Sequence, residues 1–446
     1  MNRDELKETI KGENVKYISL HLVDLPGYVK GRTIPSNTLI EVLDSGIGFD
    51  GSSIPGFVNI AESDMVMKPD IDTFLVLPYY NDKVARIICD VYKPGGERFE
   101  GDPRYVCQLA REKARNAGFI YNTAAELEFY TGKFNHNSEF EPEEAYIKEP
   151  QRYFDISPGR DSTEDFRREF ASALADTGRF TVEAYHHEVG SGQHEINFRF
   201  ADPVTTSDNI MLYKLMAKEV AKRYNLVATF MPKPWFGRTG SGMHVHLSLF
   251  KLNGENAFFD KNEYAGLSKT GRYFVGGLLR HARALSAIVA PTVNSYKRLV
   301  PGYEAPVYIM WSRRNRSALV RVPEYFPGKE KSIRVEFRCP DPLSNPYLAF
   351  AAILEAGLNG VKNKLDPGDP IEKDVYHLTP AERESLRIKT LPECLSEALD
   401  ELESDEVVKV ALGNYVYERF IDLKRKEWDE YRLRVTPWEL EKYLYA

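Results

Sequence analysis

Apolar and polar residues alternate along short runs in the first hundred residues, and this period of two predicts half-buried β-strands. Clear runs occupy residues 15–24, 73–80 and 85–92. A short helix is expected from Ser36, which can cap it, to Gly46, because glycine commonly follows the last residue of a helix. We therefore predict an N-terminal part made of strands with one short helix.

Beyond this part, runs with helical periodicity alternate with runs of period two. A stretch rich in glycine, proline and charge at residues 93–103 is typical of a domain boundary, so we expect domains of residues 1–102 and 103–446. Residues 131–152 are polar and are expected to form a surface loop. In the larger domain, helices are predicted at residues 104–118, 161–178 and 206–224, and strands at residues 125–130, 193–200, 243–250 and 332–338. The chain from about residue 380 onward is charged and is predicted to be largely helical.

Four of these strands carry functional groups that share one strand face, because they lie two residues apart. The pairs are Glu126 and Glu128, His244 and His246, and Glu336 and Arg338, while Glu195 follows closely after Glu188. The residues between the paired groups, such as Leu127 and Val245, are apolar and need a core of their own. One face should therefore pack on helices while the other presents charged groups to a shared space.

Carboxylates crowded into one space repel one another, and a bound divalent cation relieves that repulsion. Oxygen ligands with a single nitrogen suit magnesium or manganese better than zinc, and no cysteine belongs to the set. One such pair alone is about equally consistent with a solvent-exposed strand face. All four strands together favour a metal site.

Two further stretches indicate anion binding. The glycine-rich loop at residues 233–244 could bring backbone amides close to an anion, although a loop of this kind taken alone is more often an ordinary turn. Residues 312–323 contain four arginines, the residue type that recognises phosphate and carboxylate groups: Arg313, Arg314, Arg316 and Arg321. Metal ligands, arginines and an anion loop together indicate phosphoryl transfer, and no P-loop motif is present.

Composition narrows the class of protein further. The formal net charge of -7 argues against nucleic acid or an anionic membrane as the main partner. The four cysteines have neither metal-site nor disulfide spacing and are expected to be small core residues. The N-terminus lacks an apolar signal segment and no apolar run approaches the length of a membrane span, so we expect a cytoplasmic protein.

Longer motifs lie along almost the whole chain. They are Phe49-Asp50-Gly51-Ser52-Ser53 followed by Glu62-Ser63-Asp64-Met65, the segment from Lys233 to Ser248, residues 294–306, Asn315-Arg316-Ser317, and Arg334-Val335-Glu336-Phe337-Arg338. In these motifs and their order the chain resembles the type I glutamine synthetases. The resemblance implies an α+β fold with a small N-terminal β-grasp-like domain. It also implies a large catalytic domain, in which an antiparallel sheet forms a metal-lined funnel surrounded by helices.

The resemblance also implies roles for individual residues. One metal ion would be held by Glu128, Glu188 and Glu195, and a second by Glu126, His244 and Glu336, with Mg2+ or Mn2+ as the ion. Glutamate and ammonium would contact Ser53, Tyr153, Glu188, Thr239, Gly240, Arg298, Glu304, Arg316 and Arg338. ATP would contact Glu183, Phe198, His246, Ser248, Arg321 and Arg334. Asp50, Glu304 and Arg316 would take part in catalysis.

The implied reaction is the ATP-dependent ligation of ammonia to the γ-carboxylate of L-glutamate through γ-glutamyl phosphate. Asp50 would take a proton from ammonium, and Glu304 would lie on a flap that shields the intermediate from water. In the family Asp50 comes from a neighbouring subunit, which implies a homo-oligomer, namely a dodecamer of two hexameric rings. The C-terminal helix with Pro437-Trp438 would tie the rings together, and some relatives also bind nitrogen-regulatory proteins.

The chain departs from the family pattern at four places. Ala124-Ala125 replaces Gly-Pro before the first metal strand, and Thr239 stands where asparagine is usual at a glutamate-contacting position. Asn59 replaces the arginine of the glutamine-inhibited branch, and Tyr376 lies in a poor match to the adenylylated loop. We therefore expect the short, non-adenylylated subtype without glutamine feedback by that route.

Two other functions remain open from the sequence. A γ-glutamyl ligase acting on a polyamine or another amine would keep the ATP and metal residues but tend to lose the ammonium pocket. That pocket is intact here, with Asp50, Ser53, Tyr153 and Glu304 in place. A non-catalytic structural relative is disfavoured because all six implied metal ligands are present.

Overall fold

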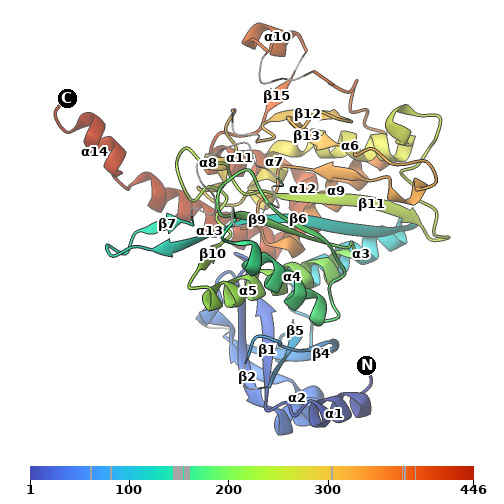
Figure 1. Cartoon of the computed structure of the whole chain (residues 1–446). Coiled ribbons are helices and arrows are strands. Elements are labelled where there is room, and N and C mark those ends of the chain that lie inside the picture. Colours follow the sequence, from blue (N-terminus) through green and yellow to red (C-terminus); the bar gives the residue numbers. More distant parts are fainter. Residues whose placement is uncertain are drawn as a thin grey trace.

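The computed structural model describes residues 1–60, 63–80, 83–143, 154, 161–302, 305–373, 375, 378–386 and 388–446. Figure 1 shows a small N-terminal body, in blue, below a larger body built around a long sheet. Each body combines helices with its own sheet, so the α+β class expected from the sequence is confirmed.

The N-terminal body contains a five-stranded sheet in the order β2-β1-β5-β4-β3. Its strands are β1 (Tyr17–Val23), β2 (Val29–Pro35), β3 (Ile47–Asp50), β4 (Asp64–Val76) and β5 (Val84–Tyr92). The central pair β1 and β5 is parallel, and the other pairs are antiparallel. The strand expected at residues 73–80 is the end of a longer strand, because β4 begins at Asp64 and ends at Val76.

This body contains two α-helices rather than the single predicted one. The predicted helix begins as a 3-10 turn, η1 (Ser36–Thr38), and continues as α2 (Leu39–Ser45), and Gly46 follows it with a φ of 73°. The helix that the sequence analysis missed is α1 (Arg3–Gly12), which buries Leu6. The sequence contains a signal for the start of α1, namely a capping box formed by Asn2 and Glu5. The Asn2 side chain accepts from the Glu5 amide, and the Glu5 side chain accepts from the Asn2 amide.

The larger body is built on a ten-stranded sheet with the main path β15-β12-β13-β14-β11-β6-β9-β8. Its strands are β6 (Phe119–Phe134), β7 (Phe140–Pro142), β8 (Val182–His187), β9 (Gln193–Phe198), β10 (Val227–Thr229), β11 (Met243–Lys251), β12 (Tyr308–Ser312), β13 (Ala318–Arg321), β14 (Val335–Phe337) and β15 (Lys389–Thr390). All pairs are antiparallel except β12 with β13. The surface loop predicted at residues 131–152 is wrong at its start, because β6 extends to Phe134 and pairs with β7.

Helices surround this sheet. They are α3 (Pro103–Asn116), α4 (Glu164–Asp176), α5 (Pro203–Arg223), α6 (Lys269–Arg280), α7 (Ala282–Val289), α8 (Ser295–Arg298), α9 (Pro346–Asn363), α10 (Pro380–Ser385), α11 (Leu395–Ser404), α12 (Glu406–Leu412), α13 (Asn414–Arg432) and α14 (Pro437–Tyr443). Three of the longest helices, α3, α5 and α9, begin in the same way. An Asp or Asn side chain caps the helix, and proline occupies its first turn; the caps are Asp102, Asp202 and Asn345. The cap accepts an amide hydrogen bond, and proline removes a donor that would otherwise lack a partner.

The apolar residues between the paired functional groups form the core. Leu127, Phe129, Val245, Val335 and Phe337 are all fully buried, as the period-two pattern predicted. Three of the four cysteines are buried as well, and the fourth, Cys394, is half-buried. The two bodies are packed together, because one continuous apolar core includes side chains of β1 and β4 together with those of the large sheet.

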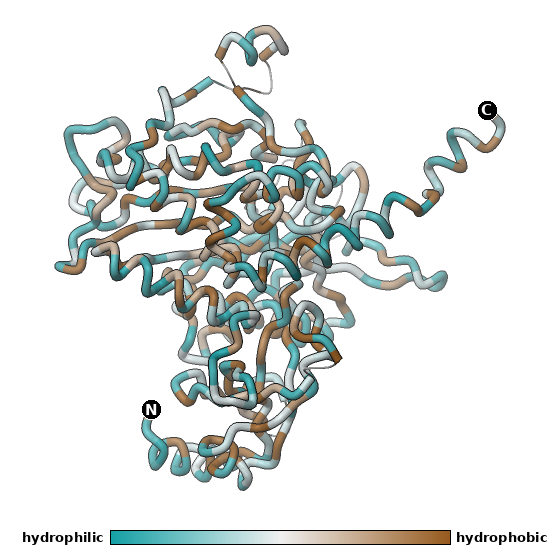
Figure 2. The backbone as a smooth tube through the Cα atoms, turned by 180° about the vertical axis from the view of Figure 1, so that it is seen from behind, coloured by the Kyte–Doolittle hydropathy of each residue, from teal (hydrophilic) through white to brown (hydrophobic). Residues whose placement is uncertain are grey.

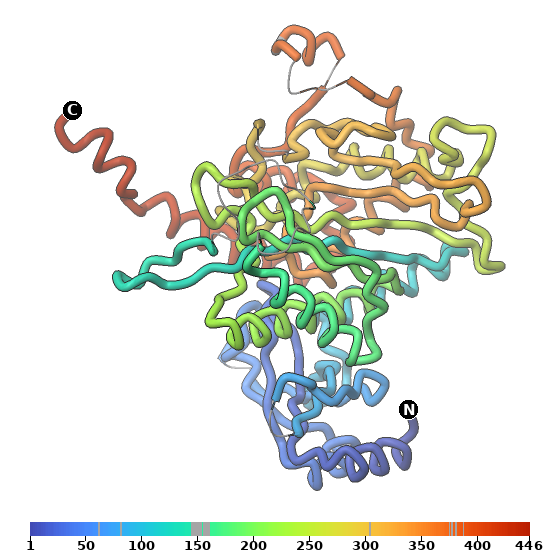
Figure 3. The backbone as a smooth tube through the Cα atoms, in the orientation of Figure 1, coloured from blue at the N-terminus to red at the C-terminus, as the bar shows by residue number. Residues whose placement is uncertain are grey.

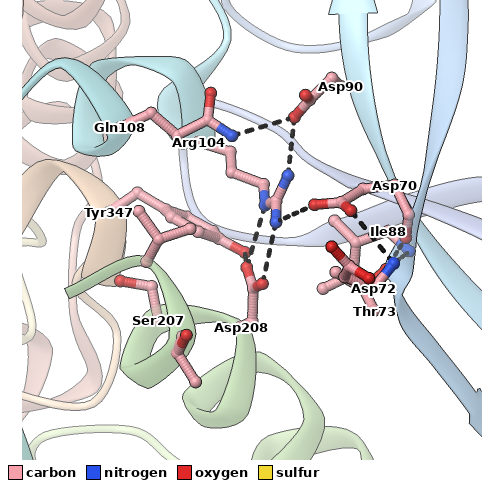
Figure 4. Close-up of polar contacts among 12 residues, drawn as sticks. Asp70, Asp72, Thr73, Ile88, Asp90, Arg104, Gln108, Ser207, Asp208 and Tyr347 are labelled. Atoms are coloured by element: carbon pink, nitrogen blue, oxygen red, sulfur yellow. Dashed lines mark hydrogen bonds and ion pairs between the residues drawn. The ribbon is translucent and has the colours of Figure 1, made fainter. Parts of the chain in front are cut away.

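A charged cluster joins the two bodies at the start of α3 (Figure 4). The Arg104 guanidinium, which is 5% exposed, lies 2.8 Å from Asp70, 2.7 Å from Asp90 and 3.2 Å from Asp208. The Tyr347 hydroxyl donates to Asp208 at 2.6 Å. Burial by itself lowers the pKa of Arg104, but Asp208 and the other anionic partners raise it well above its ordinary value.

We expect Arg104→Gln to lower the free energy of unfolding by about 3 kcal/mol, because it leaves the buried carboxylate of Asp208 without its cation, whereas Asp90 keeps its ion pair with Arg98. The measurement is the urea midpoint of the purified protein. Arg115→Gln serves as the matched control, since Arg115 is exposed on the same helix. Equal midpoints for the two variants would contradict the prediction.

The C-terminal helix α14 leaves the body of the molecule (Figure 1). Figure 2 shows hydrophobic and hydrophilic residues interspersed along this projecting end. Its large apolar side chains are exposed, with Trp438 61% and Tyr443 57% accessible. In the part of the chain that the structure describes, no helix combines the length and apolar character needed to span a bilayer.

Candidate active site

Strand register brings the predicted metal ligands to one part of the large sheet. His244 on β11 faces Glu126 on β6, and Glu128 on β6 faces Glu195 on β9. On the other side of β11, His246 faces Glu336 of β14. The teal, green, yellow-green and orange strands that carry these residues lie next to one another in Figure 3. These residues, up to 118 positions apart in the chain, thus face each other in the sheet.

These side chains line a cavity of about 240 Å³. Its wall holds all six predicted metal ligands: Glu126, Glu128, Glu188, Glu195, His244 and Glu336. It also holds the predicted substrate contacts Thr239, Gly240, Arg298, Arg316 and Arg338, together with Arg321. Five carboxylates and four arginines therefore share one small space.

Among the described residues, two groups of side chains in this cavity could hold metal ions. In the first, Glu126, His244 and Glu336 have ligand atoms within 4.8 Å of one another, and His244 Nδ1 lies 3.5 Å from Glu126 Oε2. This is the second metal set that the sequence predicted. In the other group, His186 joins Glu188 and Glu195.

Glu128, the expected third ligand of that other group, lies on the same wall but accepts from the Gly242 amide at 2.8 Å and from Gln193 Nε2 at 3.3 Å. His186 was not among the predicted ligands. It stands two residues before Glu188, which is the same spacing that identified the other pairs.

The electrostatics of the cavity fit a cation. Burial, and then Glu126, Glu188 and Glu128, raise the pKa of Glu195 well above its usual range. Burial would also raise the pKa of Glu126, but His246 and His244 hold it well below the usual range. A divalent cation would relieve the repulsion at Glu195, and carboxylate oxygens with imidazole nitrogen suit Mg2+ or Mn2+.

The arginines surround the same carboxylates. Arg321 Nε lies 2.5 Å from Glu336 Oε2, and Arg338 Nη1 lies 3.2 Å from Glu336 Oε1. Burial opposes ionisation of Glu336, but Arg338 and the nearby histidines keep its pKa low. Glu336 is therefore a buried carboxylate that belongs to a candidate metal group and also pairs with two arginines.

Arg298 packs so closely against the glycine-rich loop that Gly240 and Gly242 have no room for a side chain. A Cβ at Gly240 would lie 2.7 Å from Arg298 Cγ, and one at Gly242 would lie 2.6 Å from Arg298 Nη2. Arg298 is 5% exposed and donates to the carbonyls of Cys339 and Arg338. Any larger residue at these positions would push this guanidinium away from the cavity.

A second cavity of about 290 Å³ adjoins the first and shares Glu126 and Asn197 with it. Five of the six predicted nucleotide contacts line it: Glu183, Phe198, His246, Ser248 and Arg334. His246 connects the two cavities, since its Nε2 lies 2.8 Å from Glu126 Oε1 and its Nδ1 accepts from Arg334 at 3.0 Å. Arg321, the sixth predicted contact, lines the first cavity instead.

Two other predicted residues, Asp50 and Ser53, are described away from these cavities. Asp50 and Ser53 lie in the N-terminal body at the end of β3, where the Ser53 hydroxyl donates to Asp50 Oδ2 at 2.6 Å. Neither residue is part of the described lining of the two cavities. Tyr153 and Glu304, along with Glu62 and Tyr376 of the motifs, lie outside the residues that the structure describes.

A hydrogen-bond network behind the cavity contains residues that the sequence analysis missed. The Thr239 hydroxyl donates to Gln193 Oε1 at 2.9 Å and lies 2.8 Å from the Tyr130 hydroxyl. Gln193 Nε2 donates to the Gly240 carbonyl at 3.0 Å. Gln193 and Asn197 both line the cavity with Glu195 between them, so the period of two on β9 was the available signal.

If the substrate is glutamate, as the motifs imply, we expect Thr239→Val to raise its KM roughly fivefold, the equivalent of about 1 kcal/mol, with little change in kcat. Valine keeps the shape but removes the hydroxyl that holds Gln193 and, through it, Gly240. Steady-state kinetics with glutamate varied would test this. Thr390→Val is the control, because Thr390 lies on the edge strand β15 and is exposed. A fall in kcat without a change in KM would contradict the positioning role of Thr239.

Two family models match the chain. "Glutamine synthetase, beta-Grasp domain" matches residues 14–94, and "Glutamine synthetase, catalytic domain" matches residues 100–443. The first match confirms the β-grasp expectation for the N-terminal sheet.

Curated relatives are similar over their full lengths. A glutamine synthetase of Thermotoga maritima is 49% identical over 100% of both chains. Glutamine synthetases of Staphylococcus aureus and Methanosarcina mazei are 47% and 46% identical, covering 99% of this chain and 98% and 97% of theirs. A solved structure described as "GmaS/ADP complex-Conformation 1" superposes with a TM-score of 0.89, at 32% identity over 99% of each chain. Because both domains and the whole length match, the chain belongs to the glutamine synthetase family, as its motifs implied.

Proposed function

We propose that the chain ligates ammonia to the γ-carboxylate of L-glutamate at the expense of ATP, releasing glutamine, ADP and phosphate. The observation that carries this proposal is the cavity in which five carboxylates and a histidine face four arginines, beside a second cavity lined by the expected nucleotide contacts. Such a site can bind cations and anions together, which is what joining two anionic substrates requires.

The residues of the cavity fit Mg2+ or Mn2+. Glu126, His244 and Glu336 would hold one ion, and Glu188 and Glu195, with Glu128 or His186, another. These ions would neutralise the phosphate and carboxylate oxygens as they approach each other.

The protein's own groups would perform the remaining tasks. Arg298 and Arg338 would hold the glutamate carboxylates, while Arg316 and Arg321 would stabilise the phosphoryl group as it moves from ATP to the γ-carboxylate. Asp50 would accept a proton from ammonium, and the ammonia would then attack the acyl phosphate and release phosphate. Glu304 would help to exclude water at this stage.

The proposed active site would be completed by residues from a neighbouring subunit of a homo-oligomer. Because Asp50 and Ser53 do not line the described cavities of their own chain, we propose that they serve the site of a neighbouring subunit. The projecting α14, with Trp438 exposed, would pack on another copy in a dodecamer of two rings. We also propose that the domain boundary lies between residues 102 and 103, where Asp102 caps α3. A separate proposal is that the chain belongs to the subtype that is not adenylylated.

An acceptor assay tests the proposed function. With ATP, glutamate and Mg2+ present, ammonium should give a higher kcat/KM than putrescine or ethanolamine, and hydroxylamine should act as a small substitute. Product is measured by chromatography, and the Glu336→Gln variant serves as the blank. If an organic amine far exceeds ammonium, the chain is a γ-glutamyl ligase for that amine, and the proposal is wrong.

A further inference from the structure

A third cavity, of about 320 Å³, lies at the junction of the two bodies, away from the proposed active site. Its wall comes from β4 and β5 on one side and from α3, α5 and the segment after α4 on the other. Four arginines line it: Arg86, Arg104, Arg111 and Arg179. Among the residues that the structure describes, none lines both this cavity and the metal or nucleotide cavity.

The three carboxylates of this wall are already engaged. Asp70 and Asp208 pair with Arg104 (Figure 4), and Asp72 lies 3.0 Å from the amino group of Met1. The negative charge of the cavity is therefore taken up by groups other than Arg86.

Arg86 differs from the other three arginines. It is 3% exposed, and within the described part of the chain its guanidinium makes neither an ion pair nor a hydrogen bond, with Nε fully buried. The neighbouring arginines do have partners, because Arg179 donates to the carbonyls of Asp72 and Phe74, and Arg111 Nη1 donates to Asp202 Oδ1 at 3.2 Å. A buried guanidinium without an anion is costly, so its burial beside an open cavity needs an explanation.

We propose that this cavity binds a small oxyanion with at least two charged oxygens, such as inorganic phosphate or a dicarboxylate, with Arg86 as its main ligand. Arg179 and Arg111 border the same space and supply further N–H donors. Guanidinium groups match phosphate and carboxylate oxygens in pairs. Because the wall comes from both bodies, the bound anion stabilises their junction.

A purely structural role for Arg86 makes a different prediction. Burial lowers the pKa of Arg86 and the charge of Asp208 opposes this shift, so a structural role would make Arg86 a counter-charge to Asp208 without a direct ion pair. In that case replacing Arg86 would destabilise the protein to the same extent with or without an added anion. If the cavity is a ligand site, the replacement removes an unpaired charge, and its effect depends on the anion.

The test is thermal unfolding of the full chain in EDTA at constant ionic strength, with inorganic phosphate or succinate titrated. Without either anion, Arg86→Gln should unfold at the wild-type temperature or above it. With the anion that binds, the wild-type Tm should rise, and Arg86→Gln should need about tenfold more anion for the same rise. Arg115→Gln, exposed on α3, is the matched control and should behave as wild type.

Two further variants separate this site from the active site. Arg316→Gln removes an arginine of the catalytic cavity and should keep the anion-dependent rise in Tm. Arg179→Gln changes an exposed residue of the junction cavity, so it should fold normally and weaken the response even if Arg86→Gln does not fold. The proposal is overturned if neither anion raises the wild-type Tm, if the rise survives in Arg179→Gln and Arg86→Gln, or if Arg86→Gln is equally destabilised in all conditions.

Discussion

Glu336→Gln should reduce the rate of glutamine synthesis by roughly 10³-fold, which corresponds to about 4 kcal/mol of lost transition-state stabilisation. Glu336 is 1% exposed and contacts Arg321 and Arg338 while also belonging to a candidate metal group with Glu126 and His244. Glutamine has nearly the same shape but no charge. The substitution therefore weakens a cation site and releases two arginines from their carboxylate at once.

The measurement combines kcat with the binding of Mn2+ followed by calorimetry. Mn2+ affinity should fall by about tenfold or more, and the loss of activity should not be recovered at saturating metal. Glu255→Gln is the matched control, because Glu255 is exposed in the turn after β11 and pairs with Lys251. Full activity in Glu336→Gln, with unchanged Mn2+ binding, would remove this residue from the site.

The second large effect is a recovery of activity on mixing. Asp50→Asn and Glu336→Gln should each be nearly inactive alone, whereas particles containing both subunits in equal amounts should recover about a quarter of the wild-type activity. Random assembly places an intact Glu336 next to a neighbour's intact Asp50 in that fraction of sites. Asp50 suits ammonium because hydrogen bonds from Ser52 and Ser53 lower its pKa and keep it a carboxylate.

The experiment uses co-expression of the two variants with different affinity tags and purification on both. Activity is compared with the particles of each single variant. As a matched control, two variants of the catalytic cavity, Glu336→Gln and Glu126→Gln, should show no recovery when mixed, because one chain supplies both residues. If mixing with Asp50→Asn also gives no recovery, Asp50 does not serve a neighbouring site.

Much of the site could be predicted because it lies on strands. The alternation of Glu126, Leu127 and Glu128, and of His244, Val245 and His246, specifies which side chains share a face, since successive residues of a strand point to opposite sides. The same rule applied more widely would have found Gln193, Asn197 and His186. Asn2 and Glu5 likewise form a capping box, which could have predicted the start of the missed helix α1.

The sequence by itself thus determined the family, the presence of a β-grasp and a catalytic domain, and the strands with one apolar and one charged face. These features depend on local periodicity and on motifs of adjacent residues. Only the tertiary structure decided which strands are neighbours, that Glu128 binds Gln193 and Gly242, and that Arg86 is buried without an anion beside a cavity. The physical reason is that strand pairing and burial join segments far apart in the chain. The surroundings of a charged group therefore depend on neighbours that local sequence does not contain.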